Sequence, residues 1–110
     1  MPLPNNNLYP HFNISRLSHI ELGVRDLSAS FAFYVEILGL QVTDQNSNFI
    51  YLRGMEERGH HSVILKKSEV SSCNVLGYKV FVEEQLDKAE SYFKSKEIST
   101  SWIERPHQGK

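Results

Sequence analysis

A histidine and a carboxylate lie two positions apart in the stretch SRLSHIELGV, residues 15–24. An extended strand turns alternate side chains to the same face, so His19 and Glu21 would point the same way. Imidazole and carboxylate groups are two of the ligand types that proteins use for divalent metal ions. The stretch therefore raises the question whether His19 belongs to a metal site or is an ordinary strand residue.

The positions of two other groups of reactive residues, a histidine pair and two acidic pairs, favour structural roles for them. His60 and His61 are neighbours, and in a strand they would point to opposite faces, so we do not expect them to chelate one ion together. The acidic pair at residues 56–57 suits a solvated loop. The pair at residues 83–84 suits the N-terminal end of a helix, where negative charge is favoured.

Aromatic and sulfur-bearing side chains are weaker indications of a functional site. The group of Phe31, Phe33 and Tyr34 suggests a pocket for an aromatic ring, but the helical spacing of Phe31 and Tyr34 favours packing in the core. We expect Cys73, near the start of a strand, to be a plain small residue and not a nucleophile. The sequence has no glycine-rich phosphate loop, no nucleophile elbow and no paired-cysteine metal motif.

Composition narrows the class of protein. The chain has 110 residues, enough for one domain, and its 40% apolar and 23% charged residues are typical of soluble globular proteins. Its net charge of −1 argues against a nucleic-acid or anionic-membrane surface. No run reaches the ~20 apolar residues that span a bilayer, and the start lacks the features of a signal peptide. A single cysteine cannot form an internal disulfide, so we expect a cytoplasmic location.

The elements that position these residues follow a pattern that is repeated. Residues 1–13 are predicted to be an N-terminal arm. A first module, residues 14–73, has a strand, then a helix that Asp26 caps and Gly39 stops. The three strands that complete this module are expected over residues 40–46, 49–54 and 60–67. The second module, residues 74–110, has a strand over 74–82, a helix over 84–96 and a strand over 99–104.

The two modules overlay at an offset of 59 residues, which places Tyr78 on His19 and Phe93 on Tyr34. The predicted class is therefore α+β: a βαβββ module followed by a βαβ module that lacks its last two strands. Trp102 would lie on the last strand of this truncated module. We read the chain as a fragment that ends inside its second repeat.

This plan resembles the vicinal oxygen chelate (glyoxalase/bleomycin resistance/dioxygenase) superfamily. The stretch LSHIELGVRDLSASFAFYVEILGLQVTDQNSNFIYLRG is similar to the N-terminal domain of type I extradiol catechol 2,3-dioxygenases. The run NFIYLRGMEERGHHSVILKK is a sharper match, to the homoprotocatechuate (3,4-dihydroxyphenylacetate) dioxygenase family. The resemblance covers residues 14–104 and implies an enzyme of aromatic catabolism that uses O2 to cleave a catechol ring.

The resemblance also implies where the metal lies. Members bind Fe(II) or Mn(II) through two histidines and a glutamate in the C-terminal domain, and their N-terminal domain normally holds no metal. His19 occupies the position of the first ligand, Tyr78 that of the second, and the strand for the third is absent. Because tyrosine is a poor ligand for Fe(II) unless activated, we assign no catalytic, cofactor-binding or metal-ligating residue here and expect His19 to be structural.

Two classes of function remain open. The chain is either the non-catalytic N-terminal part of an extradiol dioxygenase, or a small glyoxalase-like enzyme or drug-binding protein with its site at a dimer interface. The end of the chain, ERPHQGK, comes before a glutamate-bearing last strand, which favours the dioxygenase part. The expected partners are then the C-terminal catalytic domain of the same protein and further copies in a homo-oligomer.

Overall fold

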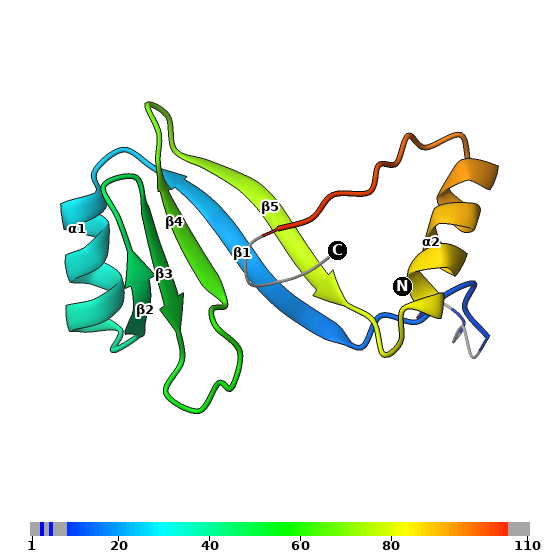
Figure 1. Cartoon of the computed structure of the whole chain (residues 1–110), viewed down its shortest axis with the longest axis horizontal. Coiled ribbons are helices and arrows are strands. Elements are labelled where there is room, and N and C mark those ends of the chain that lie inside the picture. The colour runs from blue at the N-terminus through cyan, green and yellow to red at the C-terminus, as the bar shows by residue number, and fades with distance from the viewer. Residues whose placement is uncertain (1–2, 4, 6–8, 106–110) are drawn as a thin grey trace. The chain divides into compact units, whose positions relative to one another are not determined.

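The computed structural model describes residues 3, 5 and 9–105, which form two compact units (Figure 1). The sheet unit comprises Leu17–Tyr78, and the helix unit comprises Met1–Arg16 with Lys79–Lys110. The elements in chain order are β1 (Arg16–Val24), α1 (Leu27–Phe31), the π-helix η1 (Ala32–Ile37), β2 (Gln41–Gln45), β3 (Phe49–Arg53), β4 (Val63–Lys67), β5 (Ser72–Lys79) and α2 (Glu84–Ser95).

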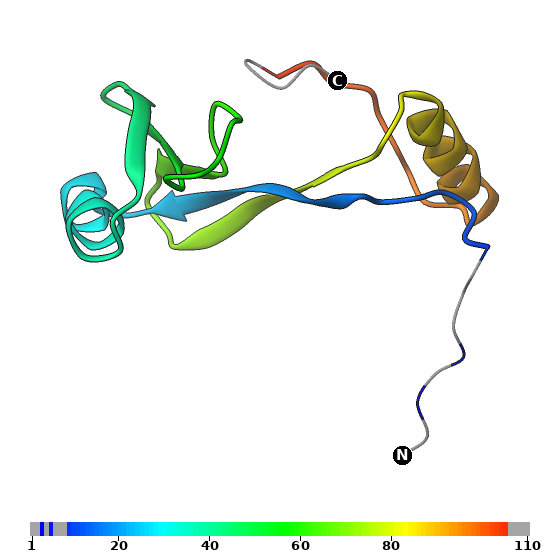
Figure 2. The ribbon, with the colours of Figure 1, turned by 90° about the horizontal axis from the view of Figure 1, so that it is seen from below.

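The strands form one sheet in the order β2-β3-β4-β1-β5. β1 pairs in parallel with β4, whereas β3 pairs in antiparallel fashion with both β2 and β4. β5 runs beside β1 in both views (Figures 1 and 2), so the strands that carry His19 and Tyr78 are neighbours in the sheet. This arrangement confirms the predicted α+β class with a glyoxalase-like plan.

One face of the sheet carries the hydrophobic core of the sheet unit. Leu52 and Leu65 are fully buried, and the strand register aligns Leu65 with Leu22 on one side and Ile50 on the other. Four residues of α1 and η1 pack against this core: Leu27, Phe31, Tyr34 and Val35. Core packing of Phe31 and Tyr34, expected from their spacing, is thus confirmed.

The first helix begins and ends as predicted but changes its winding between. The Asp26 carboxylate accepts a hydrogen bond from the Ala29 amide at 3.0 Å, and Gly39 has the left-handed φ of 79°. The second half is a π-helix, in which the Leu38 amide donates to the Phe33 carbonyl at 3.0 Å. Leu38, at the C-terminal end of this π-helix, is 55% exposed.

The helix unit contains α2 and the segments that contact it. The Asn13 amide donates to the Gln85 side chain at 2.9 Å, His11 stacks on Tyr92 with ring centroids 4.5 Å apart, and Phe12 meets Phe93 edge to face. This end of the predicted N-terminal arm therefore has no regular secondary structure but is anchored on α2.

The predicted bounds of two strands need correction, and one predicted strand does not form. β4 begins at Val63 and not at His60, and β5 spans Ser72–Lys79 and not residues 74–82. Residues 99–104, predicted to be a strand, are extended without forming one (Figure 1), because the described part of the chain offers them no partner strand. Among the described residues, no helix has the length and apolar character needed to cross a membrane.

Candidate functional site

The face of the sheet opposite the core gathers most of the chemically reactive side chains of the sheet unit. The register aligns Glu21 with Ile64, Ile64 with Tyr51, and Tyr51 with Asp44 across four strands. Because alternate residues share a face, His19 lies on the same side as Glu21. We call the following residues the polar-face cluster: His19, Glu21, Tyr51, His60, His61 and Asn74.

Glu21 is held in place although it is nearly buried. Its side chain is only 9% exposed, and the Asn74 amide of β5 donates a hydrogen bond to its Oε2 atom at 3.2 Å. A buried carboxylate needs such donors, because burial without them is costly. The contact ties β5 to β1 over a separation of 53 positions.

His19 lies over a glycine of the neighbouring strand. A Cβ atom added at Gly77 would overlap the His19 imidazole, so only glycine leaves the space that the ring occupies. The His19 Nδ1 atom lies 3.3 Å from the Ser18 hydroxyl, and its ring meets that of His61 edge to face at 5.9 Å. The ring therefore packs over β5 at Gly77, the close contact that an aromatic side chain makes with a strand glycine.

The structure brings His60 and His61 together, contrary to the argument from strand geometry. Both residues precede β4, so the alternation of a strand does not apply to them, and their Nδ1 atoms lie 2.8 Å apart. His61 is 8% exposed, and the Tyr51 ring contacts both imidazoles, at 5.4 Å from His60 and 4.9 Å from His61. At that distance the Nδ1–H group of one ring donates a hydrogen bond to the Nδ1 atom of the other.

The polar-face cluster offers imidazole, carboxylate and phenol groups for proton exchange and hydrogen bonding. Within the described residues, no three side chains of the histidine, cysteine, aspartate and glutamate types converge as metal ligands. Tyr78, which the repeat overlay places on His19, lies on β5 and is 55% exposed. The acidic pair at residues 56–57 is exposed in a loop, as predicted, and Cys73 is free and exposed on β5.

The sequence did not reveal the roles of three residues. Tyr51 and Asn74 belong to the polar-face cluster, and Gly77 lies beneath His19. Tyr51 follows the predicted alternation of β3, so its face was available from the pattern. Asn74 and Gly77 acquire their roles only through the pairing of β5 with β1, which the sequence of β5 does not reveal. A glycine inside a predicted strand was the one available signal of a close approach.

Comparison with known proteins identifies the superfamily of this chain. Residues 16–100 match the family model described as the Glyoxalase/Bleomycin resistance protein/Dioxygenase superfamily. The match covers most of the chain. The chain therefore belongs to this superfamily, as the sequence pattern indicated.

The similar proteins within that superfamily are ring-cleaving dioxygenases. The chain is 25% identical to metapyrocatechase of Geobacillus stearothermophilus over 95 residues, which are 86% of this chain and 29% of that protein. It is also 25% identical to a manganese-dependent 2,3-dihydroxybiphenyl 1,2-dioxygenase of Geobacillus genomosp. 3, over 83% of this chain and 29% of that protein.

Solved structures give a closer likeness. Homoprotocatechuate 2,3-dioxygenase from B. fuscum is 37% identical with a TM-score of 0.81, and the match covers 89% of this chain and 27% of that one. The enzyme from Arthrobacter globiformis is 35% identical with the same TM-score of 0.81, over 89% of this chain and 30% of that one.

This chain spans less than a third of the length of the dioxygenases that it matches. A separate glyoxalase-like or drug-binding protein is not favoured, because these relatives are extradiol dioxygenases.

Proposed function

We propose that this chain is the non-catalytic N-terminal part of a metal-dependent extradiol dioxygenase that cleaves catechols. The observation that carries the proposal is the likeness to homoprotocatechuate 2,3-dioxygenase, which extends over 89% of this chain but only 27% of that enzyme. The proposed substrates of the whole enzyme are a catechol and O2, and its proposed metal is Fe(II) or Mn(II), held outside this chain.

The geometry of the polar face supports a structural role for this part. His19 is committed to the contact with Gly77, and Glu21 accepts a hydrogen bond from Asn74. Both residues that suggested half of a metal site therefore join β1 to β5. The proposed partners are the catalytic part of the same enzyme and further copies of it in a homo-oligomer.

Three measurements test the assignment. Calorimetry with Mn(II) on this chain should show no micromolar binding, and an assay for the yellow ring-cleavage product of catechols should show no turnover. A chimera in which this chain replaces the matching part of the B. fuscum homoprotocatechuate 2,3-dioxygenase should retain ring cleavage, because the two folds superpose closely.

The same measurements can overturn the proposal. Micromolar Mn(II) binding that His19→Ala abolishes would make His19 a ligand. Catechol cleavage by this chain alone would place the active site here. A folded chimera that binds its metal but has lost ring cleavage would show that this chain does not serve as the structural part of such an enzyme.

A further inference from the structure

The two histidines before β4 share a hydrogen bond that only some protonation states allow. The Nδ1 atoms of His60 and His61 lie 2.8 Å apart, and the bond between them needs one Nδ1–H group and one Nδ1 atom without hydrogen. Two neutral rings satisfy this need, and so does a pair that holds one extra proton. Two imidazolium rings do not, because both of their Nδ1 atoms carry hydrogen. The contact therefore survives the first extra proton and is lost with the second.

The surroundings of His61 hold that ring in place. His61 is 8% exposed, and its ring centroid lies 5.9 Å from that of His19 and 4.9 Å from that of Tyr51. The next residue, Ser62, is bound through its backbone to β3 and to β1, by hydrogen bonds of 2.8 and 2.9 Å. When the bond between the histidines breaks, His61 therefore stays and His60 moves.

His60 ends a loop that can move without uncovering the core. The loop joins β3 to β4 (Figure 1), and its residues 55–59 are all exposed. Within it, the Glu57 amide donates to the Gly54 carbonyl at 3.3 Å, which closes a turn. A Cβ atom added at Gly59 would meet nothing within 4 Å, so there is open space beside His60. Loss of the bond to His61 thus frees His60 and its loop, while β3 and β4 stay paired.

Other charged and titratable groups on this face carry mixed signs. β1 contributes His19 and Glu21, β3 contributes Tyr51 and Arg53, and β4 contributes Lys66 further along. The loop itself adds two glutamates and an arginine, which are exposed and therefore screened by solvent. The two rings, in contrast, carry the same sign once both are protonated, and like charges at so short a distance repel each other strongly.

We propose that His60 and His61 form a proton-operated latch. The latch holds the loop of residues 54–60 on the polar face at neutral pH and releases it when both rings are protonated. Histidine is the side chain that changes charge between about pH 5 and pH 8, and clusters of histidines act as pH sensors in this range. The pair belongs to the sheet unit alone, so its test does not depend on the dioxygenase assignment.

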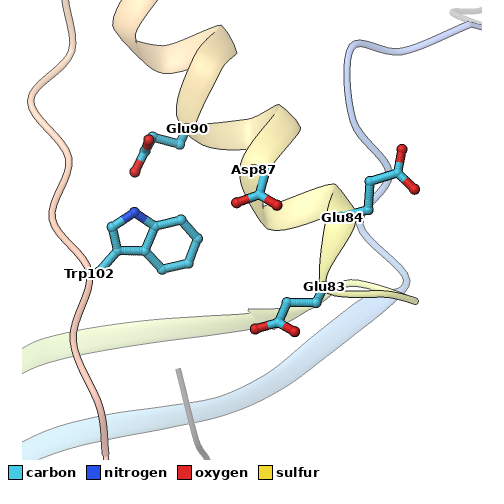
Figure 3. A pocket seen from close by; sticks show the side chains of 5 residues that line it. All are labelled: Glu83, Glu84, Asp87, Glu90 and Trp102. Atoms are coloured by element: carbon cyan, nitrogen blue, oxygen red, sulfur yellow. The ribbon is translucent and has the colours of Figure 1, made fainter.

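A second group of titratable side chains must be separated from the latch. In the helix unit, four carboxylates face Trp102 across a hollow beside α2 (Figure 3): Glu83, Glu84, Asp87 and Glu90. These groups also take up protons as the pH falls. Trp102 is the only tryptophan of the chain, so its emission reports on the helix unit, whereas the amides of residues 54–60 report on the latch.

The experiment records nuclear magnetic resonance spectra of the nitrogen-15-labelled full chain between about pH 7.5 and about pH 5. At the upper end we expect a scalar coupling between the two Nδ1 nuclei, which a hydrogen bond transmits. At the lower end this coupling should disappear, and amide protection at residues 54–60 should fall by about threefold to tenfold, the factor that one net hydrogen bond contributes. The amides of β3 and β4 should keep their protection, because their ladder is not part of the latch.

A substitution at His60 tests the role of its second proton. In His60→Gln the amide side chain can still form a hydrogen bond with His61 but takes up no proton, so protection of the loop should be the same at both ends of the pH range. His11→Gln removes an imidazole from the helix unit, and Glu83→Gln with Asp87→Asn removes two carboxylates beside Trp102. Both controls keep the pair and should show the same loss of loop protection as the native chain.

Three kinds of result would overturn the proposal. Absence of the scalar coupling at about pH 7.5, or its persistence at about pH 5, would show that protons do not switch this hydrogen bond. Loss of the coupling without loss of loop protection would show that the pair does not hold the loop, and equal losses in β3 and β4 would indicate unfolding of the sheet unit. A pH response that His60→Gln leaves unchanged, or that either control removes, would assign the response to other groups.

Discussion

Replacing Gly77 by alanine should destabilise the sheet unit, although alanine normally stabilises a strand relative to glycine. Gly77 has no left-handed φ, so its backbone accepts alanine, and the lower entropy of the unfolded chain would by itself contribute about 0.4–1 kcal/mol of stability. The added Cβ, however, would overlap three atoms of the His19 ring. Overpacking of this kind costs about 1–3 kcal/mol, because the ring or β5 must move.

The assay is thermal unfolding followed by circular dichroism, with two controls. Each kcal/mol corresponds to a shift in Tm of about 4–8 °C for a small domain. Gly59→Ala adds a Cβ that meets no atom within 4 Å, so it should leave Tm unchanged or raise it slightly. In a His19→Ala background the ring is absent, so Gly77→Ala should cost less than half of what it costs in the native chain.

Two results of the double-mutant cycle would refute the predicted clash between Gly77→Ala and the His19 ring. If Gly77→Ala lowers Tm equally with and without the His19 ring, the loss does not come from their contact, and His19 does not join β1 to β5. If Gly77→Ala raises Tm, the His19 ring moves aside freely, and its close contact with Gly77 does not affect the free energy of unfolding.

Substitutions at three further positions test the core and the first helix. Leu65→Ala should lower the free energy of unfolding by about 2–5 kcal/mol, because Leu65 is fully buried, whereas Leu38→Ala at a 55% exposed site should cost far less. Urea unfolding measures both losses, and equal losses would contradict this difference in burial. Asp26→Ala removes the carboxylate that accepts from Ala29 and should cost about 1 kcal/mol by the same measurement, while Asp26→Asn should retain most of the stability.

The sequence sufficed for features that depend on a few neighbouring residues. The cap at Asp26, the left-handed stop at Gly39 and the extent of α2 follow from local chemistry, and each lies where it was predicted or within one residue of it. The turn of the β2–β3 hairpin is equally local, because the Asn46 side chain accepts hydrogen bonds from the amides of Asn48 and Phe49 at 2.8 and 2.9 Å.

The errors concern features that a distant partner decides. Residues 99–104 have strand propensity but no strand beside them, and propensity alone does not form a ladder. His60 and His61 precede the apolar run of β4. The ladder with β3 begins only where Leu52 lies opposite Val63, so both histidines lie outside the strand, with their Nδ1 atoms 2.8 Å apart. The contacts of Glu21 and His19 with β5 likewise cannot be read from either strand alone.

The position of β1 in the sheet has a consequence for the order of folding. β1 precedes all other strands in the chain, but its two neighbours, β4 and β5, come later, and Glu21 meets Asn74 only after 53 further positions. The β2–β3 hairpin and the first helix need only local contacts, whereas β1 must wait for loops that close slowly. We therefore expect β1, although it is made before β4 and β5, to enter the sheet only when both of these strands are available. We expect this late insertion to limit the folding rate, with His19 and Gly77 meeting only in the final step.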